Sequence, residues 1–196
     1  MNNKALFNIS YGLFILTAKQ GEKDNGCIIN TFMQLTSSPL SVSIAVNKDN
    51  YTTQMIKETG EFNITVLTED TSFDTFKRFG FASGKNTDKF EGLTPERSAN
   101  GIAYLDGNSY FSCKVKEAVD CGTHLIFVAD VLEMEVLNSR PSATYDYYHK
   151  NIKPKPQEKK KGFRCTICNY VLEADTLPED FICPICKHGA EAFVPL

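Results

Sequence analysis

Residues 163–196 read FRCTICNYVLEADTLPEDFICPICKHGAEAFVPL and contain two Cys-x-x-Cys pairs, Cys165/Cys168 and Cys183/Cys186. The gap between the pairs is 14 residues (183 − 168 − 1). Two pairs at such a spacing can bring four thiolates onto one tetrahedral metal ion. A segment this short cannot build a sufficient hydrophobic core, so metal binding must supply much of its folding free energy. The spacing fits zinc and iron equally, since both accept four thiolates.

The charges along the rest of the chain separate three regions. The 196 residues carry a formal net charge of −3, but residues 1–149 contain 13 basic and 18 acidic side chains, a net of −5. Residues 150–162 contain 6 Lys and 1 Glu, a net of +5, and residues 163–196 contain 2 basic and 5 acidic side chains, a net of −3. The middle region has two prolines and almost no apolar residues. We expect it to be a solvated linker between domains at 1–149 and 163–196.

The composition bears on partners and compartment. The small negative net charge gives no basic surface that would make nucleic acid the expected partner. The longest apolar runs are far shorter than the ~20 residues of a membrane-spanning helix, and the N-terminus lacks the features of a secretory signal. We therefore expect a cytoplasmic protein without a membrane anchor. Thiols stay reduced in that compartment, so the seven cysteines indicate metal or redox chemistry rather than disulfides.

Residues 1–149 mostly have the pattern of β-strands. Five apolar stretches predict strands: 12–19, 27–35, 40–46, 62–67 and 102–137, the last with a break near 120–122. Asn25-Gly26 between the first two predicts a hairpin turn. Asp49 or Asn50 is expected to cap a short helix that ends at Gly60, and residues 73–79 are expected to be helical. The pattern favours an antiparallel barrel with helical insertions over a doubly wound sheet.

One polar segment of the N-terminal region is a candidate cofactor site. Asn30, Gln34 and Thr36 are polar positions in an otherwise apolar strand, where they could hydrogen-bond a heteroaromatic ring and a polyol chain. Lys48 and Thr52 stand at the start of the predicted helix, which suits a phosphate. No Gly-x-Gly-x-x-Gly motif follows a strand. The residues alone leave this interpretation level with a half-exposed strand followed by an ordinary capped helix.

The C-terminal segment resembles rubredoxin, in the shortened form found at the end of rubrerythrins. The matching residues are Phe163-Arg164-Cys165, Cys168-x-Tyr170, Asp180-Phe181-Ile182-Cys183-Pro184-x-Cys186, His188 and Phe193. The resemblance implies one iron ion, held by the four cysteines, that alternates between its ferric and ferrous states. Rubredoxins usually place a glycine with positive φ after each pair, whereas Asn169 and Lys187 occupy those positions here. Because rubrerythrin tails also lack the second glycine, we prefer iron to zinc.

Residues 1–149 resemble the flavin reductase family of FMN-binding split barrels. The matching features are Tyr11-Gly12, Asn30-Thr31, Gln34-x-Thr36-Ser37-x-Pro39, Asn47-Lys48 with Thr52, and Thr123-His124-x-x-Phe127-x-x-x-Val131. A further stretch is similar to the subgroup that includes archaeal ferric reductase: Phe79-Gly80-Phe81-x-Ser83-Gly84-Lys85 with Asp88-Lys89-Phe90. The resemblance implies a mainly β split barrel, non-covalently bound FMN near a homodimer interface, and NADH or NADPH as the hydride donor.

The resemblance also implies roles for single residues. The isoalloxazine and ribityl groups of FMN would contact Asn30, Thr31, Gln34 and Thr36, with a further hydroxyl from Ser37. The FMN phosphate would contact Asn47, Lys48 and Thr52. His124 would border the flavin or the nicotinamide and is the candidate catalytic residue, although a lone His on a strand is often structural. Cys27 could approach the same pocket, but buried cysteines usually behave as small hydrophobic residues, and Cys113 and Cys121 are expected in the core.

The two resemblances together describe a fusion that would pass electrons from NAD(P)H through FMN to iron and then to an external acceptor. The partner that the family implies is a flavodiiron protein that removes oxygen or nitric oxide. An acidic C-terminal domain suits docking on a basic face, and the tether raises the concentration of one redox centre around the other. The alternatives are a flavin or ferric reductase with a structural tail, a non-enzymatic electron carrier, and a zinc-ribbon binding module.

Overall fold

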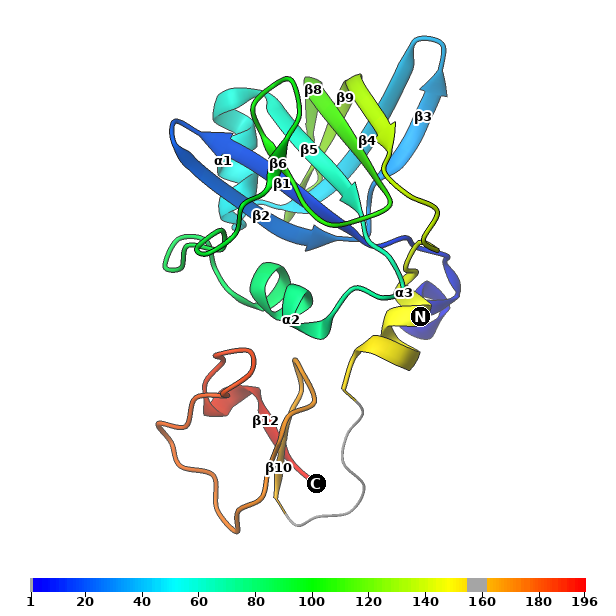
Figure 1. Cartoon of the computed structure of the whole chain (residues 1–196). Coiled ribbons are helices and arrows are strands. Elements are labelled where there is room, and N and C mark those ends of the chain that lie inside the picture. Colours follow the sequence, from blue (N-terminus) through cyan, green and yellow to red (C-terminus); the bar gives the residue numbers. More distant parts are fainter. Residues whose placement is uncertain (1, 155–161) are drawn as a thin grey trace.

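Seven strands of the N-terminal region form one curved antiparallel sheet in the computed structural model, which describes residues 2–154 and 162–196 (Figure 1). The strand order is β2-β1-β5-β8-β9-β4-β3. The strands are β1 (Phe14–Gln20), β2 (Lys23–Ile29), β3 (Met33–Ser37), β4 (Leu40–Asn47), β5 (Glu61–Val66), β8 (Ser109–Asp120) and β9 (His124–Val136). The edge strands β2 and β3 are not paired with each other within the described part of the chain, so the barrel is split.

Strand β1 lies in the interior of this sheet, between β2 and β5. Alternate side chains of a strand point to opposite faces. Leu16 and Ala18 belong to the core inside the curved sheet, whereas Leu13 and Ile15 belong to a second core on its other face. All four side chains are almost completely buried. Burial on both faces explains why the stretch 12–19 is a continuous apolar run instead of an alternating one.

Helix α1 (Tyr51–Thr59) begins and ends where the sequence predicts. The Asn50 side chain accepts a hydrogen bond from a backbone N–H of the first turn at 3.1 Å. Gly60 ends the helix with a φ of 73°, a left-handed conformation that glycine adopts readily. The apolar side of the helix, formed by Met55 and Ile56, is buried in the core inside the sheet. The N-terminal end of α1 therefore has a fixed position on the barrel.

The first hairpin differs from the prediction in the place of its turn. Strands β1 and β2 pair as expected, but the turn lies at Gly21-Glu22, where Gly21 has a φ of 58°, and Asn25-Gly26 lies inside β2. Asn25 is 1% exposed, and its Nδ2 donates a hydrogen bond to Oγ1 of Thr52 at 2.9 Å. This long-range contact overrides the local turn preference of an Asn-Gly pair.

Four short helical segments lie below the sheet in the view of Figure 1. They are α2 (Phe73–Phe76), the π-helix η2 (Lys77–Phe81), α3 (Tyr145–Tyr147) and the π-helix η3 (Tyr148–Ile152). Their side chains form the second core together with β1, mainly through Phe76, Phe79 and Tyr148. The π-helix η3 extends into the expected linker 150–162, and residues 155–161 lie outside the described residues. The domain boundaries stay predictions.

The remaining elements of the N-terminal region are small. They are the 3-10 helix η1 (Asn3–Asn8) and a two-stranded sheet of β6 (Glu96–Arg97) and β7 (Ala103–Tyr104). Across the described residues, no helix combines the length and the apolar character needed to cross a bilayer.

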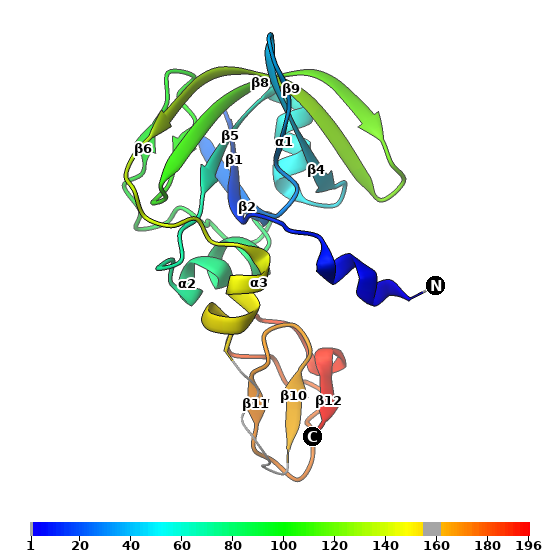
Figure 2. The same ribbon diagram turned by 90° about the vertical axis from the view of Figure 1, so that its right-hand side faces the viewer.

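The C-terminal region forms its own three-stranded sheet, which lies below the helical segments in both Figure 1 and Figure 2. Its elements are β10 (Phe163–Cys165), β11 (Val171–Leu172), the 3-10 helix η4 (Ala190–Ala192) and β12 (Phe193–Pro195). The core of this region consists of the four cysteines with Ala192 and Phe193. The expected fold class is therefore confirmed: a mainly β split barrel with short helices, followed by a small four-cysteine domain.

Candidate functional site

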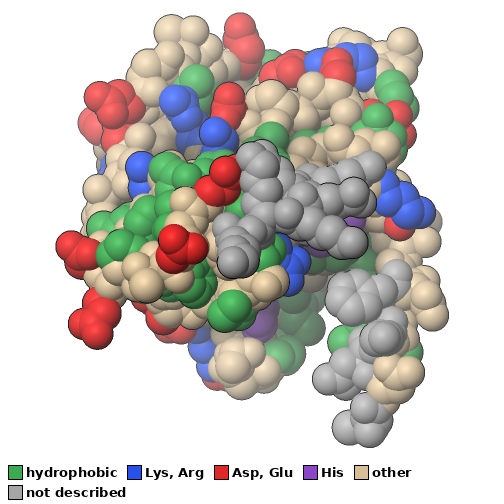
Figure 3. Space-filling view, turned by 90° about the horizontal axis from the view of Figure 1, so that it is seen from below, with side chains coloured by type: hydrophobic (Ala, Val, Ile, Leu, Met, Phe, Trp, Pro, Cys, Tyr) green, Lys and Arg blue, Asp and Glu red, His purple; other side chains and the backbone are tan. Residues whose placement is uncertain are grey.

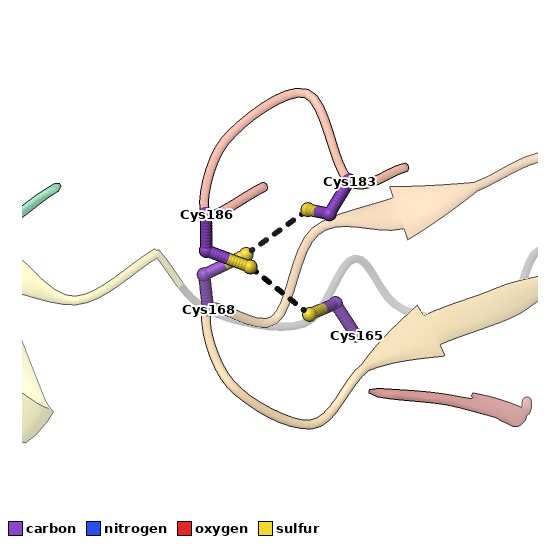
Figure 4. A group of neighbouring side chains, drawn as sticks. All are labelled: Cys165, Cys168, Cys183 and Cys186. Atoms are coloured by element: carbon purple, nitrogen blue, oxygen red, sulfur yellow. Dashed lines mark hydrogen bonds between the residues drawn. The ribbon is translucent and has the colours of Figure 1, made fainter. Parts of the chain in front are cut away.

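Four cysteine side chains converge in the C-terminal region (Figure 4). Their Sγ atoms all lie within 4.8 Å of one another, with 3.5 Å between Cys165 and Cys186 and 3.6 Å between Cys168 and Cys183. Four sulfur atoms at ~2.3 Å from one tetrahedral metal ion are about 3.8 Å apart. The arrangement therefore fits a single ion, and it brings together all four predicted ligands.

The backbone of each cysteine pair turns through a left-handed residue, as the sequence predicts. Asn169 has a φ of 63° and Lys187 a φ of 62°. The Asn169 N–H donates to the Cys165 carbonyl and the Lys187 N–H to the Cys183 carbonyl, both at 2.9 Å. A side chain with a Cβ atom costs ~1 kcal/mol or more in this conformation. Both positions adopt it nevertheless, because the turn is what points two sulfur atoms of one pair at the same ion.

The protonation state of the cysteine thiols depends on whether a metal ion is bound. Burial raises the pKa of the Cys168 thiol to about 11, and it also raises the pKa of Cys186. Burial acts in the same direction on Cys183, but backbone N–H groups of Cys186 and Ile185 bond its sulfur and lower its pKa overall. Without a metal ion, neutral thiols are favoured at Cys168 and Cys186. Binding of a metal ion must therefore release protons.

A groove on the barrel faces the cysteine region. It consists of two adjoining cavities, of about 240 Å³ and 260 Å³, which share Ile28, Gly80 and Phe81. We call the two cavities together the interdomain groove. Its polar end is lined by residues from the start of α1 and from the loop after η2, among them Asp49, Asn50, Ser83, Gly84 and Lys89. Its apolar end is lined mainly by Leu13, Phe76, Tyr145, Tyr148 and Ile167.

A buried lysine lines the polar end of the interdomain groove. Lys89 is 4% exposed, and its Nζ donates to the carbonyls of Gly26 at 2.8 Å and Phe79 at 3.1 Å. Burial lowers the pKa of Lys89, while the nearby Cys27 acts in the opposite direction. Burial also raises the pKa of Cys27 against the effect of the Thr52 hydroxyl. The Lys89 ammonium makes this end suitable for an anion such as a phosphate, whereas the N–H groups of Thr52, Thr53 and Gln54 in the first turn of α1 already donate to Asn50.

The predicted phosphate-binding residues divide between the core and the surface. Thr52 is fully buried, and the Asn47 side chain accepts a hydrogen bond from the Asp49 N–H at 2.8 Å. Lys48 turns toward solvent and bonds the carboxylate of Asp120 at 2.6 Å. This hydrogen bond holds the pKa of the Asp120 carboxyl below its usual range. A phosphate bound by Lys48 would have to compete with that carboxylate.

His124 lies next to this group. It pairs with Asn47 across β4 and β9, is exposed, and has its Nδ1 at 2.9 Å from Oγ1 of Thr123. Its catalytic role stays a prediction. Cys113 is buried as expected, but Cys121 is exposed at the β8–β9 turn, so the expectation of a core position for Cys121 was wrong.

The predicted ring-binding residues lie in the connection that follows β2 and on the edge strand β3. The expected strand 27–35 is broken between β2 and β3, where Asn30 and Thr31 are half-buried. Thr31 donates its hydroxyl hydrogen to the Ala45 carbonyl at 2.6 Å. The other three residues are exposed on the edge strand β3, which points away from the C-terminal region (Figure 1): Gln34, Thr36 and Ser37. A single chain does not gather the predicted FMN-binding residues into one pocket, and their roles stay predictions.

The sequence analysis assigned no role to the loop that follows η2. A Cβ atom on Gly84 would lie 2.0 Å from Oδ1 of Asn25, so this loop approaches β2 so closely that only glycine fits. Ser83 and Lys89 from the same loop line the interdomain groove. The signal that could have identified this loop was the motif at residues 79–90. It resembles one subgroup of the family, but the sequence analysis assigned no ligand contact to it. A buried lysine cannot be told from a surface lysine in a sequence.

Comparisons with known proteins match the N-terminal and the C-terminal regions of the chain to two different families. The flavin reductase like domain family matches residues 6–155, and the rubrerythrin, rubredoxin-like domain family matches residues 163–194. The high molecular weight rubredoxin of Moorella thermoacetica is 37% identical over 227 aligned residues, which cover 98% of this chain and 99% of that protein. The ferric-chelate reductase (NAD(P)H) of Archaeoglobus fulgidus is 34% identical over 151 residues, 76% of this chain and 89% of that protein.

A solved structure supports the fold of the barrel. The NADH:FAD oxidoreductase of Streptomyces globisporus, in complex with NAD and FAD fragments, superimposes with a TM-score of 0.64 at 20% identity, covering 72% of this chain and 84% of that chain. The four buried thiols fit the iron of a rubredoxin-like domain, and the polar end of the interdomain groove, with the buried Lys89, fits an anionic group such as the phosphate of a flavin. The chain belongs to the flavin reductase like family and carries a four-cysteine, rubredoxin-like iron domain at its C-terminal end.

Proposed function

We propose that this protein is an NAD(P)H-dependent oxidoreductase that passes electrons through FMN to the iron at its four cysteines and on to an external acceptor. The observation that carries the proposal is the pairing of the two domains in one chain, with the interdomain groove facing the cysteine region. A flavin, when bound, accepts the two electrons of a hydride and gives them up one at a time, which a single iron ion requires.

The chain's own residues bind and orient the reactants. At the polar end of the interdomain groove, Lys89 would hold the phosphate, with Asn50 and Ser83 as further polar contacts. The residues that the family resemblance implies lie outside the lining of this groove, and their contacts with FMN are a separate part of the proposal: Asn30, Thr31, Gln34, Thr36, Ser37, Asn47, Lys48 and Thr52. His124 would contact the flavin or the nicotinamide from its exposed position on β9. None of these side chains is required to act as a base, since hydride transfer is cofactor chemistry.

For the acceptor, we propose a redox protein with a basic docking face, of the flavodiiron type. Residues 163–196 contain 5 acidic and 2 basic side chains, and all five acidic side chains are exposed. Figure 3 shows acidic side chains around an apolar area on the face seen from below, where the C-terminal region lies. Complementary charge would speed the encounter and make it dependent on ionic strength.

We propose further that the protein acts as a homodimer in the cytoplasm. Strand β9 carries a row of exposed apolar side chains at alternate positions: Leu132 (55% exposed), Met134 (51%) and Val136 (77%). Such a row on one face of a sheet is typical of a surface that a partner covers. All seven cysteines are free thiols, which suits a reducing compartment. Sedimentation of the native protein and of Met134→Asp tests the dimer, since the substitution should shift it toward the monomer.

An anaerobic titration tests the proposed reaction. The purified protein should show the absorption of both bound flavin and ferric tetrathiolate, and addition of NADH or NADPH should bleach both bands. The comparison of the two nucleotides decides the preferred donor. A protein with flavin absorption alone, together with zinc by metal analysis, would contradict the electron relay. A protein whose flavin is not reduced by either nucleotide would be an electron carrier instead of an enzyme.

A second candidate is a flavin or ferric reductase in which the C-terminal domain is structural. It is favoured by the relative named a ferric-chelate reductase, which aligns over 151 residues, 76% of this chain. The substitution Cys165→Ala separates the two functions. Under the relay it should abolish electron delivery to the protein acceptor while flavin reduction by nicotinamide continues. Under the reductase it should leave turnover with a ferric chelate or with free flavin intact.

A further inference from the structure

The first cysteine pair contacts the barrel of its own chain. Ile167, between Cys165 and Cys168, lines the apolar end of the interdomain groove. Phe73 is the first residue of α2, and Phe81 is the last residue of η2, which follows α2 directly. Both side chains pack against the four-cysteine core, and their ring centroids are 6.0 Å apart.

A hydrogen bond also links the residue after the first cysteine pair to the chain that follows η3. The Asn169 side chain donates a hydrogen bond from Nδ2 to the Pro154 carbonyl at 3.3 Å. The second cysteine pair has a different environment, since Ile182 beside Cys183 is 61% exposed. The two cysteine pairs are therefore inequivalent: the first faces the interdomain groove, and the second is preceded by a large exposed apolar side chain.

Phe81 contributes both to the interdomain groove and to the packing of the four-cysteine core. It lines the polar and the apolar end of the interdomain groove, and it also packs against the four-cysteine core. Packed atoms conduct electrons better than a water-filled gap of the same width. A ligand in the groove and an ion at the cysteines would thus be connected through the partly buried side chains of Phe81 and Ile167.

We propose that the first cysteine pair is the entry point for electrons, docked in cis over the interdomain groove, and that Phe73 and Phe81 are positioning residues for this transfer. The inference rests on the proposed function and specifies its internal step. Each NAD(P)H gives up two electrons and releases one proton as NAD(P)⁺ forms. The two electrons reduce ferric iron to ferrous iron twice in succession, and the external acceptor takes the first electron before the second arrives.

The test uses Phe73→Asp, because Phe73 packs on the cysteine core as well as on the second core of the barrel but does not line the groove. The matched control is Leu93→Asp, an apolar side chain on the same barrel that is 36% exposed and outside the contact. The docking equilibrium should weaken about tenfold, since placing a charge where a phenylalanine was half-buried costs roughly one decade. Phe73→Ala provides a milder variant if the aspartate disturbs α2.

Two measurements report the result in the full-length protein. Amide hydrogen exchange at residues 163–170 should accelerate in Phe73→Asp and stay unchanged in Leu93→Asp. In stopped flow, flavin reduction by nicotinamide should keep its rate in Phe73→Asp while bleaching of the ferric band slows about tenfold. In the native protein the rate of that bleaching should not depend on protein concentration.

Unchanged hydrogen exchange in both Phe73 variants would overturn the docking proposal, and a rate of iron reduction that rises with protein concentration would overturn the route within one molecule. The exchange measurement does not need redox activity and can be made on zinc-loaded protein. Failure of the proposed function would therefore appear as absent flavin or iron reduction with docking intact, a different result from failure of this inference.

Discussion

Replacing the buried Lys89 by methionine tests the structure of the interdomain groove most directly. Methionine keeps the length and the apolar stem of lysine but cannot donate a hydrogen bond. The substitution removes both bonds from Nζ, at 2.8 Å to the Gly26 carbonyl and at 3.1 Å to the Phe79 carbonyl. These two bonds join strand β2 to the π-helix η2, which lie far apart in the sequence.

The expected loss of stability follows from these contacts. A hydrogen bond from a charged donor contributes about 1.5–3 kcal/mol, and two such bonds are lost. The burial that lowers the pKa of Lys89 shows that the ammonium also carries a desolvation cost, which the substitution relieves and which offsets part of the loss. We expect the free energy of unfolding to fall by about 2–4 kcal/mol, equivalent to a decrease in Tm of roughly 5–15 °C for a chain of this size.

The assay is urea unfolding followed by circular dichroism, with flavin affinity measured separately by fluorescence. The matched control is Lys85→Met, an exposed lysine of the same loop, which should change stability by about 0.5 kcal/mol or less. Lys89→Met should also weaken FMN binding, because the groove loses its buried positive charge. Equal stability of Lys89→Met and Lys85→Met would refute the assigned role of the two carbonyl contacts, and unchanged FMN affinity would place the phosphate elsewhere.

Three further predictions follow from the same geometry. Gly84→Ala should destabilise the protein by about 1–3 kcal/mol in urea unfolding, because its Cβ would meet Asn25 at 2.0 Å, whereas Gly80→Ala, with its nearest neighbour at 3.5 Å, should cost about 0.5 kcal/mol or less. Burial lowers the pKa of Lys89, so above that pKa the folded protein has lost a proton that the unfolded chain still binds, and the contribution of Lys89 to stability rises with pH up to about 10.4. Burial raises the pKa of Cys27 and Cys113, whose contributions fall as pH rises, so the effect is measured as the stability of the native protein minus that of Lys89→Met, which should increase with pH. Removal of the metal by a chelator should make residues 163–196 sensitive to protease while the barrel stays resistant, since structural metal sites contribute about 10–16 kcal/mol of folding free energy; protease resistance of the metal-free tail would contradict this.

The sequence was sufficient where structure is set by residues close together in the chain. The spacing of the four cysteines identified the ligand set, and the positive φ values of Asn169 and Lys187 followed from the turn that each pair must make. The caps of helix α1 at Asn50 and Gly60 were also predicted, because capping is a contact over a few residues. The strand-rich pattern indicated an antiparallel barrel for the same reason, since alternation and turns are local signals, and the family resemblance added that the barrel is split.

Contacts between distant segments were decided only by the tertiary structure. Asn25-Gly26 has the composition of a turn, yet it lies within β2 because Asn25 bonds Thr52 and the loop at Gly84 packs on its side chain. Likewise, the interdomain groove combines the start of α1, the loop after η2 and Ile167 of the C-terminal domain. The sequence by itself determined the metal ligands and the two kinds of domain. The folded chain determined which side chains share a groove and which cysteine pair faces it, because burial and long-range pairing depend on the whole sheet.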